Sequence, residues 1–173
     1  MHSEYTGRQV RLRVLEDDDL DTVLALIRST PNYFAAIGYG REPLSKLELQ
    51  RDFEEAQATE GRTLYAIERQ SDHTLIGMAD VRLETTMSDT ATIALLLIAG
   101  PYQQHGYGSE AAELLEQALW AEPEVEFIMA GVAESSQLGQ RFWQSRGYQP
   151  SGMTTHDPQT SRTTVWFAKR RPA

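Results

Sequence analysis

The amino-acid sequence predicts one mixed α/β domain whose sheet is mostly antiparallel. The 173 residues suffice for a single core, and they contain no repeat, low-complexity stretch or linker. Strand-like and helix-like stretches follow one another irregularly, which differs from a regular βαβ array. Two strand-like stretches in the first half are joined by a short polar turn, which indicates a hairpin. We expect one domain over residues 1–173, with its core between about residues 8 and 168.

The first two helices are indicated by apolar periodicity and by capping residues. Residues 8–14 alternate between polar and apolar, as a half-buried strand does. The acidic residues 16–19 offer N-caps to a helix over 20–27, whose apolar side chains share one face. Ser45 can cap a second helix over 46–58. The chain therefore begins β-α-α.

Three strands and a third helix follow. Residues 63–69 and 75–83 are strand-like on either side of a polar turn. Residues 91–99 include the most apolar run of the chain, too short to cross a bilayer, and we expect a buried strand there. After Gly108 the apolar residues lie on one helical face. The remaining elements are a strand at 125–132, a helix at 135–146, and a terminal pair of strands at 148–153 and 163–168.

Composition excludes several classes of function. The formal net charge is −9, which argues against a nucleic-acid-binding protein and slightly favours a cationic partner such as an amine. The absence of cysteine excludes disulfides, thiolate zinc sites and a cysteine nucleophile. No spacing of His, Asp or Glu resembles a metal site. Neither a signal peptide nor a membrane-spanning stretch is present, so we expect a cytoplasmic protein.

A glycine-bearing loop joins the most apolar strand to the following helix. Backbone N–H groups at a helix N-terminus bind phosphate, and Gly106 and Gly108 would let it approach closely. An ordinary turn would also explain both glycines. Gly106-x-Gly108-x-x-Ala111 satisfies a weak dinucleotide-binding pattern, with Glu134 as the ribose-binding acid. This second interpretation, an NAD-dependent oxidoreductase, is opposed by the position of the loop late in the chain.

The pattern Gln103-x-x-Gly106-x-Gly108 after an apolar strand resembles the GNAT superfamily of N-acetyltransferases. A second block, 132–148, is similar to the strand–helix segment of that family, since it carries Phe142-Trp143 and ends in Gly147-Tyr148. Ser136 stands where the family often has Asn, and Gly139 where it often has Ala. With the order of the elements, the resemblance extends from about Val10 to Phe167.

The resemblance implies a GNAT fold, in which a central parallel strand pair splays apart and is flanked by helices. It also implies acetyl-CoA as cosubstrate, no metal, and direct attack of an amine on the thioester. The pantetheine arm would pair with backbone groups of Leu96, Leu97 and Ile98. The pyrophosphate would lie on amides of Gln103, Gln104, His105, Gly106, Tyr107, Gly108 and Ser109. Ser136 and Trp143 would complete the cofactor site.

The catalytic groups are not assigned by the resemblance. The usual thiolate donor of the family is a tyrosine at the position of Trp143, which we expect to pack against the cofactor. Candidate bases are Asp80 and Glu84 on the preceding strand, Glu134 at the end of the splayed strand, and His156 with Asp157 in the loop between the last strands. Tyr33 and Tyr39 are candidates for the acceptor pocket.

The sequence does not identify the acceptor substrate. Protein N-termini, polyamines, amino acids and aminoglycoside-like molecules are all compatible with the sequence, whose acidity leans towards a cation. A rival from another class is an acyl-CoA-binding regulator without turnover, which Trp143 in place of tyrosine favours. The terminal strand pair would suit a dimer edge, so a monomer or a homodimer is expected.

Overall fold

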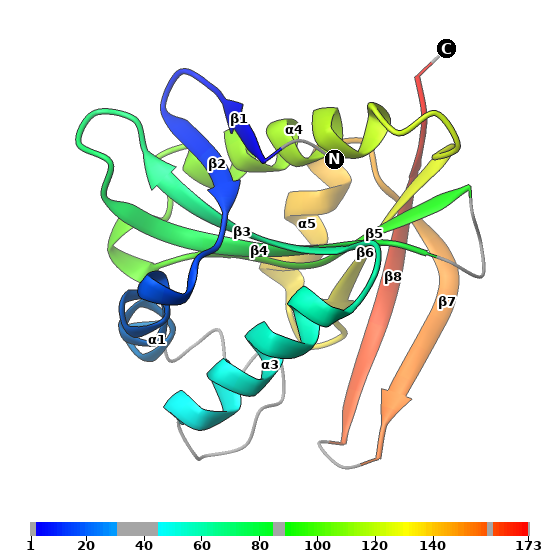
Figure 1. The fold of residues 1–173 in the computed structure, drawn as a ribbon. Helices are drawn as coiled ribbons and strands as arrows, with labels where there is room; N and C mark the ends of the chain where they lie inside the picture. The colour runs from blue at the N-terminus through cyan, green and yellow to red at the C-terminus, as the bar shows by residue number, and fades with distance from the viewer. Residues whose placement is uncertain (1–2, 31–44, 85–88, 159–160, 173) are drawn as a thin grey trace.

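The computed structural model describes residues 3–30, 45–84, 89–158 and 161–172. Within them, an eight-stranded sheet has helices on both faces (Figure 1). The strands lie in the order β1-β2-β3-β4-β5-β6-β8-β7, and the β5–β6 pair alone is parallel among them. The strands are β1 (Glu4–Thr6), β2 (Val10–Val14), β3 (Arg62–Arg69), β4 (Leu75–Leu83), β5 (Thr90–Ile98), β6 (Phe127–Ala133), β7 (Gln149–Asp157) and β8 (Arg162–Arg170). The predicted mixed, mostly antiparallel sheet is confirmed.

In the described ranges, four α-helices cover the two faces of the sheet. Helices α1 (Leu20–Arg28) and α3 (Lys46–Ala58) pack on one face. Helices α4 (Tyr107–Trp120) and α5 (Gln137–Ser145) lie on the other, where their apolar residues join the larger core cluster. Leu115 and Leu119 of α4 are fully buried there. Each such side chain contributes about 1.5–3 kcal/mol through burial.

The helix caps follow the expected chemistry. Ser45 Oγ accepts a hydrogen bond from the backbone N–H of Glu48 at 3.2 Å, and Glu48 Oε2 accepts one from the Ser45 backbone N–H at 2.8 Å. This reciprocal capping box starts α3 where the sequence predicts. Ser136 caps α5, since its hydroxyl accepts a hydrogen bond from Gly139 N–H at 3.3 Å. Both helices therefore begin at a serine whose hydroxyl accepts a hydrogen bond from the backbone N–H three residues later.

Strands β5 and β6 pair over only part of their length. Their parallel register runs from Thr90–Phe127 to Ile93–Ala130 and then stops. The register between β4 and β5 shifts at the same level, where Asp80 pairs with Leu95 and Val81 with Ile93. Ala94 is thus the extra residue of a bulge, which bends β5 away from its parallel neighbour. The splayed pair implied by the family resemblance is present.

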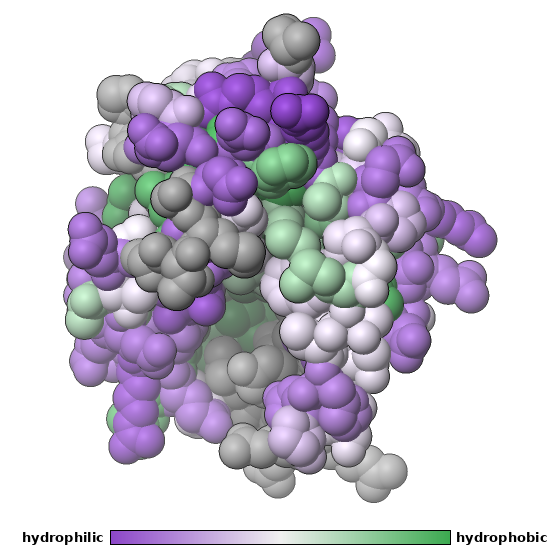
Figure 2. Space-filling model, turned by 90° about the vertical axis from the view of Figure 1, so that its right-hand side faces the viewer, coloured by the Kyte–Doolittle hydropathy of each residue, from purple (hydrophilic) through white to green (hydrophobic). Residues whose placement is uncertain are grey.

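The last two strands are longer than predicted, so His156 and Asp157 lie in β7 and not in a loop. All nine residues of β7 are exposed, and the strand consequently lacks the polar–apolar alternation by which a half-buried strand is recognised. This edge strand lies on the side of the molecule that Figure 2 shows. Side chains of intermediate and high hydropathy adjoin a hollow there, among strongly hydrophilic ones. The three-residue β1 was also not predicted.

Candidate functional site

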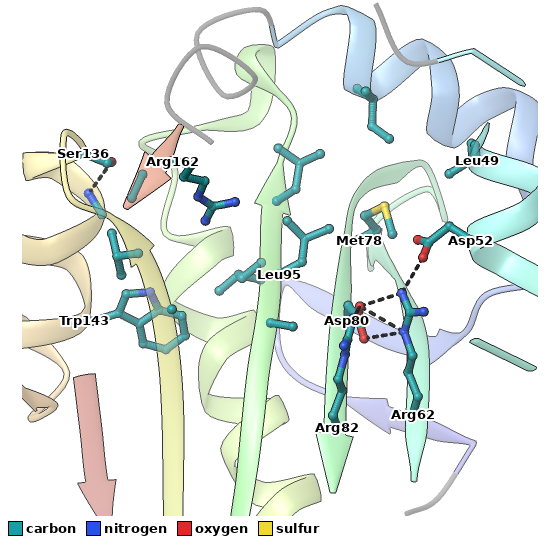
Figure 3. Close-up of a pocket in the computed structure, with 18 of the residues that line it drawn as sticks. Leu49, Asp52, Arg62, Met78, Asp80, Arg82, Leu95, Ser136, Trp143 and Arg162 are labelled. Atoms are coloured by element: carbon teal, nitrogen blue, oxygen red, sulfur yellow. Dashed lines mark hydrogen bonds and ion pairs between the residues drawn. The ribbon is translucent and has the colours of Figure 1, made fainter. Parts of the chain in front are cut away.

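A cleft of about 560 Å³ opens where β5 and β6 diverge. Its walls come from both strands, α5 and β8 on one side, and from α3, β3 and β4 on the other (Figure 3). The residues that line it are Ile27, Glu48, Leu49, Asp52, Arg62, Met78, Asp80, Arg82, Ala94, Leu95, Leu96, Leu97, Gly131, Val132, Ala133, Ser136, Gly139, Trp143 and Arg162. Leu96, Leu97, Ser136 and Trp143 among them belong to the predicted cofactor site.

The end of β5 offers backbone groups to this cleft. Ala99 donates its N–H to Ile76 of β4. Because successive residues of a strand turn their backbone groups to opposite sides, Leu97 also faces β4, whereas Leu96 and Ile98 face the side that β6 has left. The Ile98 carbonyl there accepts a hydrogen bond from Gln103 Nε2 at 2.8 Å. Gln103 thereby fixes the glycine loop to the strand end, a role for its side chain that the sequence did not predict.

The glycine loop leads into the N-terminus of α4. Gly106 is the N-cap residue, and its φ of 86° is one that glycine adopts without strain. The amides of Tyr107, Gly108 and Ser109 form the first turn, where no helical carbonyl is available to accept from them. Helix geometry therefore makes this end of α4 a site for an anion.

The surroundings of the loop suit an anion as well. No acidic residue occurs between 103 and 109. The carboxylate of Glu110, the first acid of α4, is held by Gln9, whose backbone N–H and side-chain amide donate to it at 2.9 and 3.2 Å. Residues 103–106 are exposed, and the His105 ring stacks beside Tyr107. The loop lies next to the strand end but does not line the cleft itself.

Helix α5 brings an aromatic wall to the cleft. Trp143 is 6% exposed and packs edge-on against Phe142 and Tyr148, whose ring centroids lie 5.1 and 4.8 Å away. At Gly139 an added Cβ would come within 2.8 Å of Val132 Cγ1. An alanine at this position would require Val132 or the helix to shift, which agrees with the departure from the alanine of the family pattern.

Charged side chains gather on the opposite wall (Figure 3). Arg62 Nε donates to both carboxylate oxygens of Asp80 at 3.2 and 3.1 Å, and its Nη2 donates to Asp80 at 2.8 Å and to Asp52 at 2.8 Å. Arg82 adds a further hydrogen bond to Asp80 at 3.0 Å. The side chains of Arg62 and Asp80 are 5% and 8% exposed. Burial lowers the pKa of Arg62, but its hydrogen bonds to these carboxylates outweigh that effect and raise the pKa.

One of the five candidate bases lies in the cleft, and Asp157, exposed on β7, does not line it. Asp80 lines it, with both oxygens already bonded to arginine. Glu84 lies beyond the end of β4 and accepts a hydrogen bond from Thr92 at 2.8 Å. Glu134 is exposed after β6, and His156 is exposed on β7 beside Thr163. The last three do not line the cleft.

Sequence reasoning missed the ionic lining of the cleft. Glu48 and Asp52 lie one turn apart on α3, so both face it, and Arg62, Arg82 and Arg162 reach it from three strands. The i, i+4 spacing of the two acids was a usable signal. No comparable sequence signal marks the arginines, because they come together only in the folded chain. Tyr33 and Tyr39, predicted for the acceptor pocket, lie outside the described residues.

The described residues contain neither a metal-binding cluster nor a membrane-spanning helix. No group of three or more His, Asp or Glu side chains could hold a metal ion within those residues. None of the helices in the described ranges is both long and apolar enough to span a membrane.

Solved structures of several acetyltransferases share this fold. An acetyltransferase from Thermus thermophilus superposes with a TM-score of 0.78 at 22% identity, covering 99% of this chain and 100% of that one. Spermidine N-acetyltransferase from Vibrio cholerae, in complex with CoA and spermine, gives 0.73 at 18%, covering 95% and 96%. An aminoglycoside acetyltransferase in complex with coenzyme A gives 0.77 at 20%, covering 94% and 95%. These likenesses are likenesses of fold.

The chain was also compared with known proteins by sequence. No curated protein sequence matches this chain. The family described as "Acetyltransferase (GNAT) domain" matches residues 9–149, most of the chain and the whole span from β2 to the start of β7. The alternative of a dinucleotide-binding oxidoreductase is not supported, because its sheet would be largely parallel. The chain belongs to the GNAT family of acetyltransferases.

Proposed function

We propose that this protein transfers the acetyl group of acetyl-CoA to the amine of an acceptor. The observation that carries the proposal is the interrupted β5–β6 ladder, which stops at Ile93 and Ala130 and leaves unpaired strand edges around a 560 Å³ cleft. An extended amide-containing group can complete such an edge as an added strand would. The acetyl thioester of the cosubstrate supplies an activated carbonyl that an amine can attack without a covalent enzyme intermediate.

Residues at the end of β5 and in the following loop would hold the cosubstrate. The backbone groups of Leu96 and Ile98 face the side of β5 that β6 has left. The Ile98 carbonyl already accepts a hydrogen bond from Gln103. The first-turn amides of α4, Tyr107 to Ser109, would take the pyrophosphate. Trp143 and Gly139 would pack along the pantetheine arm from α5. The donor set is amide-rich and free of carboxylates, which fits a bisphosphate.

Proton removal from the amine needs no buried carboxylate in this proposal. Asp80 is held by Arg62 and Arg82, and Glu48 accepts hydrogen bonds from the Ser45 amide and hydroxyl, which hold its pKa below the usual range. Glu48 is therefore poorly placed to accept a further proton, and both carboxylate oxygens of Asp80 already accept hydrogen bonds from Arg62. We assign the proton transfer to water in the cleft and a packing role to Trp143.

Release of free coenzyme A tests the proposal. Purified protein would be mixed with acetyl-CoA and, in separate reactions, with amino acids, short peptides, polyamines and aminoglycosides, and thiol release would be followed. We expect release that depends on at least one amine. Reactions without protein and reactions without amine are the controls.

A second candidate function is an acyl-CoA-binding regulator. Trp143 favours it, since the indole lining the cleft cannot act as the acid that a tyrosine would provide at this position. Tight binding of acetyl-CoA with no turnover across the whole amine panel would select this second candidate. Amine-dependent thiol release would eliminate it.

A further inference from the structure

The charged side chains of the cleft are unequally partnered. Three carboxylates and three arginines line it among the described residues: Glu48, Asp52, Asp80, Arg62, Arg82 and Arg162. Asp80 is bonded to two arginines, Asp52 to one, and Glu48 to its own helix cap. Arg162 is the exception within the described chain, because its Nε is buried and has no hydrogen-bond partner there.

Arg162 lies on the same face of the sheet as the paired charges. Phe167 and Val165 of β8 pack into the core under α4 and α5. Since side chains alternate along a strand, Arg162 is on the opposite face, the one that α3 covers. Figure 3 shows its guanidinium pointing into the cleft towards β5, across from Asp80 and Arg62. The guanidinium of Arg162 therefore faces the space between the two walls of the cleft.

An anion would complete this site, and the cosubstrate is poorly placed to supply it. The amides proposed to bind the pyrophosphate belong to α4, on the other face of the sheet. The pantetheine arm that would lie between the splayed strands is uncharged. A carboxylate is the group that a guanidinium fork binds best, through two parallel hydrogen bonds.

Resting on the proposed function, we infer that Arg162 binds a carboxylate of the acceptor, so that the acceptor carries an acid group as well as the amine that is acetylated. Arg162 would hold the carboxylate beside β8, and the amine would lie towards the wall with Asp52 and Glu48, whose charge attracts an ammonium group. This class contains amino acids and acidic peptides. It differs from the cationic acceptors that the net charge of the sequence favours.

Matched acceptors test the inference. Each amino acid or dipeptide in the panel would be compared with its C-terminal carboxamide, which keeps the size and the amine and removes only the negative charge. A peptide pair that differs by Asp or Asn at its second residue separates a side-chain carboxylate from a terminal one. Thiol release gives kcat and KM for each acceptor with the unaltered protein and with Arg162→Gln, Arg162→Lys and Arg170→Gln.

In at least one matched pair, we expect the unaltered protein to prefer the acceptor with the carboxylate over its carboxamide by about tenfold or more in kcat/KM. The difference should lie mostly in KM, because the carboxamide loses a charge-assisted hydrogen bond. Arg162→Gln should abolish that preference, and Arg162→Lys should keep part of it. Arg170→Gln, which removes a charge from the far end of the same strand, should leave it intact.

Three outcomes would overturn the inference. Equal use of carboxylate and carboxamide by the unaltered protein would do so, as would a preference that Arg162→Gln leaves in place. Turnover of polyamines alone would also overturn it while leaving the acetyltransferase proposal standing. Absence of thiol release with every acceptor would remove the proposed function and this inference together.

Discussion

Ile93 of β5 and Ala130 of β6 form the last pair of the parallel ladder, although both strands continue, to Ile98 and Ala133. The bulge at Ala94 diverts β5 at this level, and a cleft opens between the strands. Arg62, Asp80 and Arg162 meet this cleft on one face of the sheet, and Trp143 closes it on the other. The place where two strands part therefore determines where a cosubstrate and an acceptor would meet.

Gly106→Asp should weaken the binding of coenzyme A by at least about tenfold. The substitution adds a side chain and a negative charge at the N-terminus of α4, where the pyrophosphate is proposed to lie, and charge at this position acts against an anion. Affinity would be measured by calorimetric titration, and the fold by circular dichroism.

A matched control separates charge from backbone strain. Gly152 has a φ of 79°, close to that of Gly106, and an added Cβ there meets nothing within 4 Å. Gly152→Asp should therefore carry a similar conformational cost and leave coenzyme A affinity unchanged. Equal affinity for the unaltered protein and Gly106→Asp would mean that the loop only makes a turn.

Asp80→Asn should lower the free energy of unfolding by about 3 kcal/mol, because it leaves the buried Arg62 guanidinium without its main counter-charge. Arg82→Gln removes the partner that is 46% exposed and should cost less than about 1 kcal/mol. Urea unfolding monitors both. If Asp80 were the general base, Asp80→Asn would instead reduce kcat by about 10²-fold or more while stability changed little.

Trp143→Phe keeps an aromatic ring in the cleft and removes the indole N–H. We expect KM for acetyl-CoA to rise, because we propose that Trp143 packs against the cosubstrate. We expect kcat to change by less than about tenfold, because Trp143 is not a general acid, whose loss would cost about 10²–10⁴-fold. Steady-state kinetics and the pH dependence of kcat provide the measurement. A fall in kcat beyond that range, together with an altered pH profile, would give Trp143 a chemical role.

Acid should destabilise the protein partly through the cluster around Arg13. This guanidinium bonds Asp19 through two nitrogens, at 2.7 and 2.8 Å, and lowers the pKa of Asp19. Burial raises the pKa of Glu68, but hydrogen bonds from Arg11 and Arg13 outweigh it and lower that pKa. Carboxyl groups with a lowered folded-state pKa stabilise the protein above their ordinary values, about 3.9 and 4.3, and lose this contribution as the pH falls further.

Arg13→Gln tests this pH dependence. Without the guanidinium, both carboxyl groups should titrate nearer their ordinary values, so the variant should lose less free energy of unfolding between pH 7 and pH 3 than the unaltered protein does. Urea unfolding at each pH provides the comparison. Equal losses in the two proteins would place the origin of acid sensitivity elsewhere.

Local sequence signals predicted most of the fold. The apolar face of α4, the Ser45 capping box and the apolar run of β5 each depend on residues close together in the chain, and each element lies where the sequence places it. Strand β7 escaped full prediction because its exposed residues show no alternation. His156 consequently lies in a strand and away from the cleft, contrary to expectation.

The candidate site was predictable only where a motif describes it. The glycine loop and the 132–148 block are contiguous patterns, so the residues proposed to hold the cosubstrate could be named from them. The side of the cleft that we propose for the acceptor is assembled from single charged residues on α3, β3, β4 and β8. Arg62 and Asp80 are eighteen positions apart in sequence and meet because β3 and β4 pair in register. No periodicity marks such a pair before the fold is known.

Calorimetric titration with acetyl-CoA, using NAD(H) as the control ligand, tests whether the cleft between β5 and β6 binds an acyl-CoA. We expect binding of acetyl-CoA in the micromolar range and no heat of binding with NAD(H). Absence of acetyl-CoA binding, or binding of NAD(H) in its place, would contradict the assignment of the cleft between β5 and β6 to an acyl-CoA.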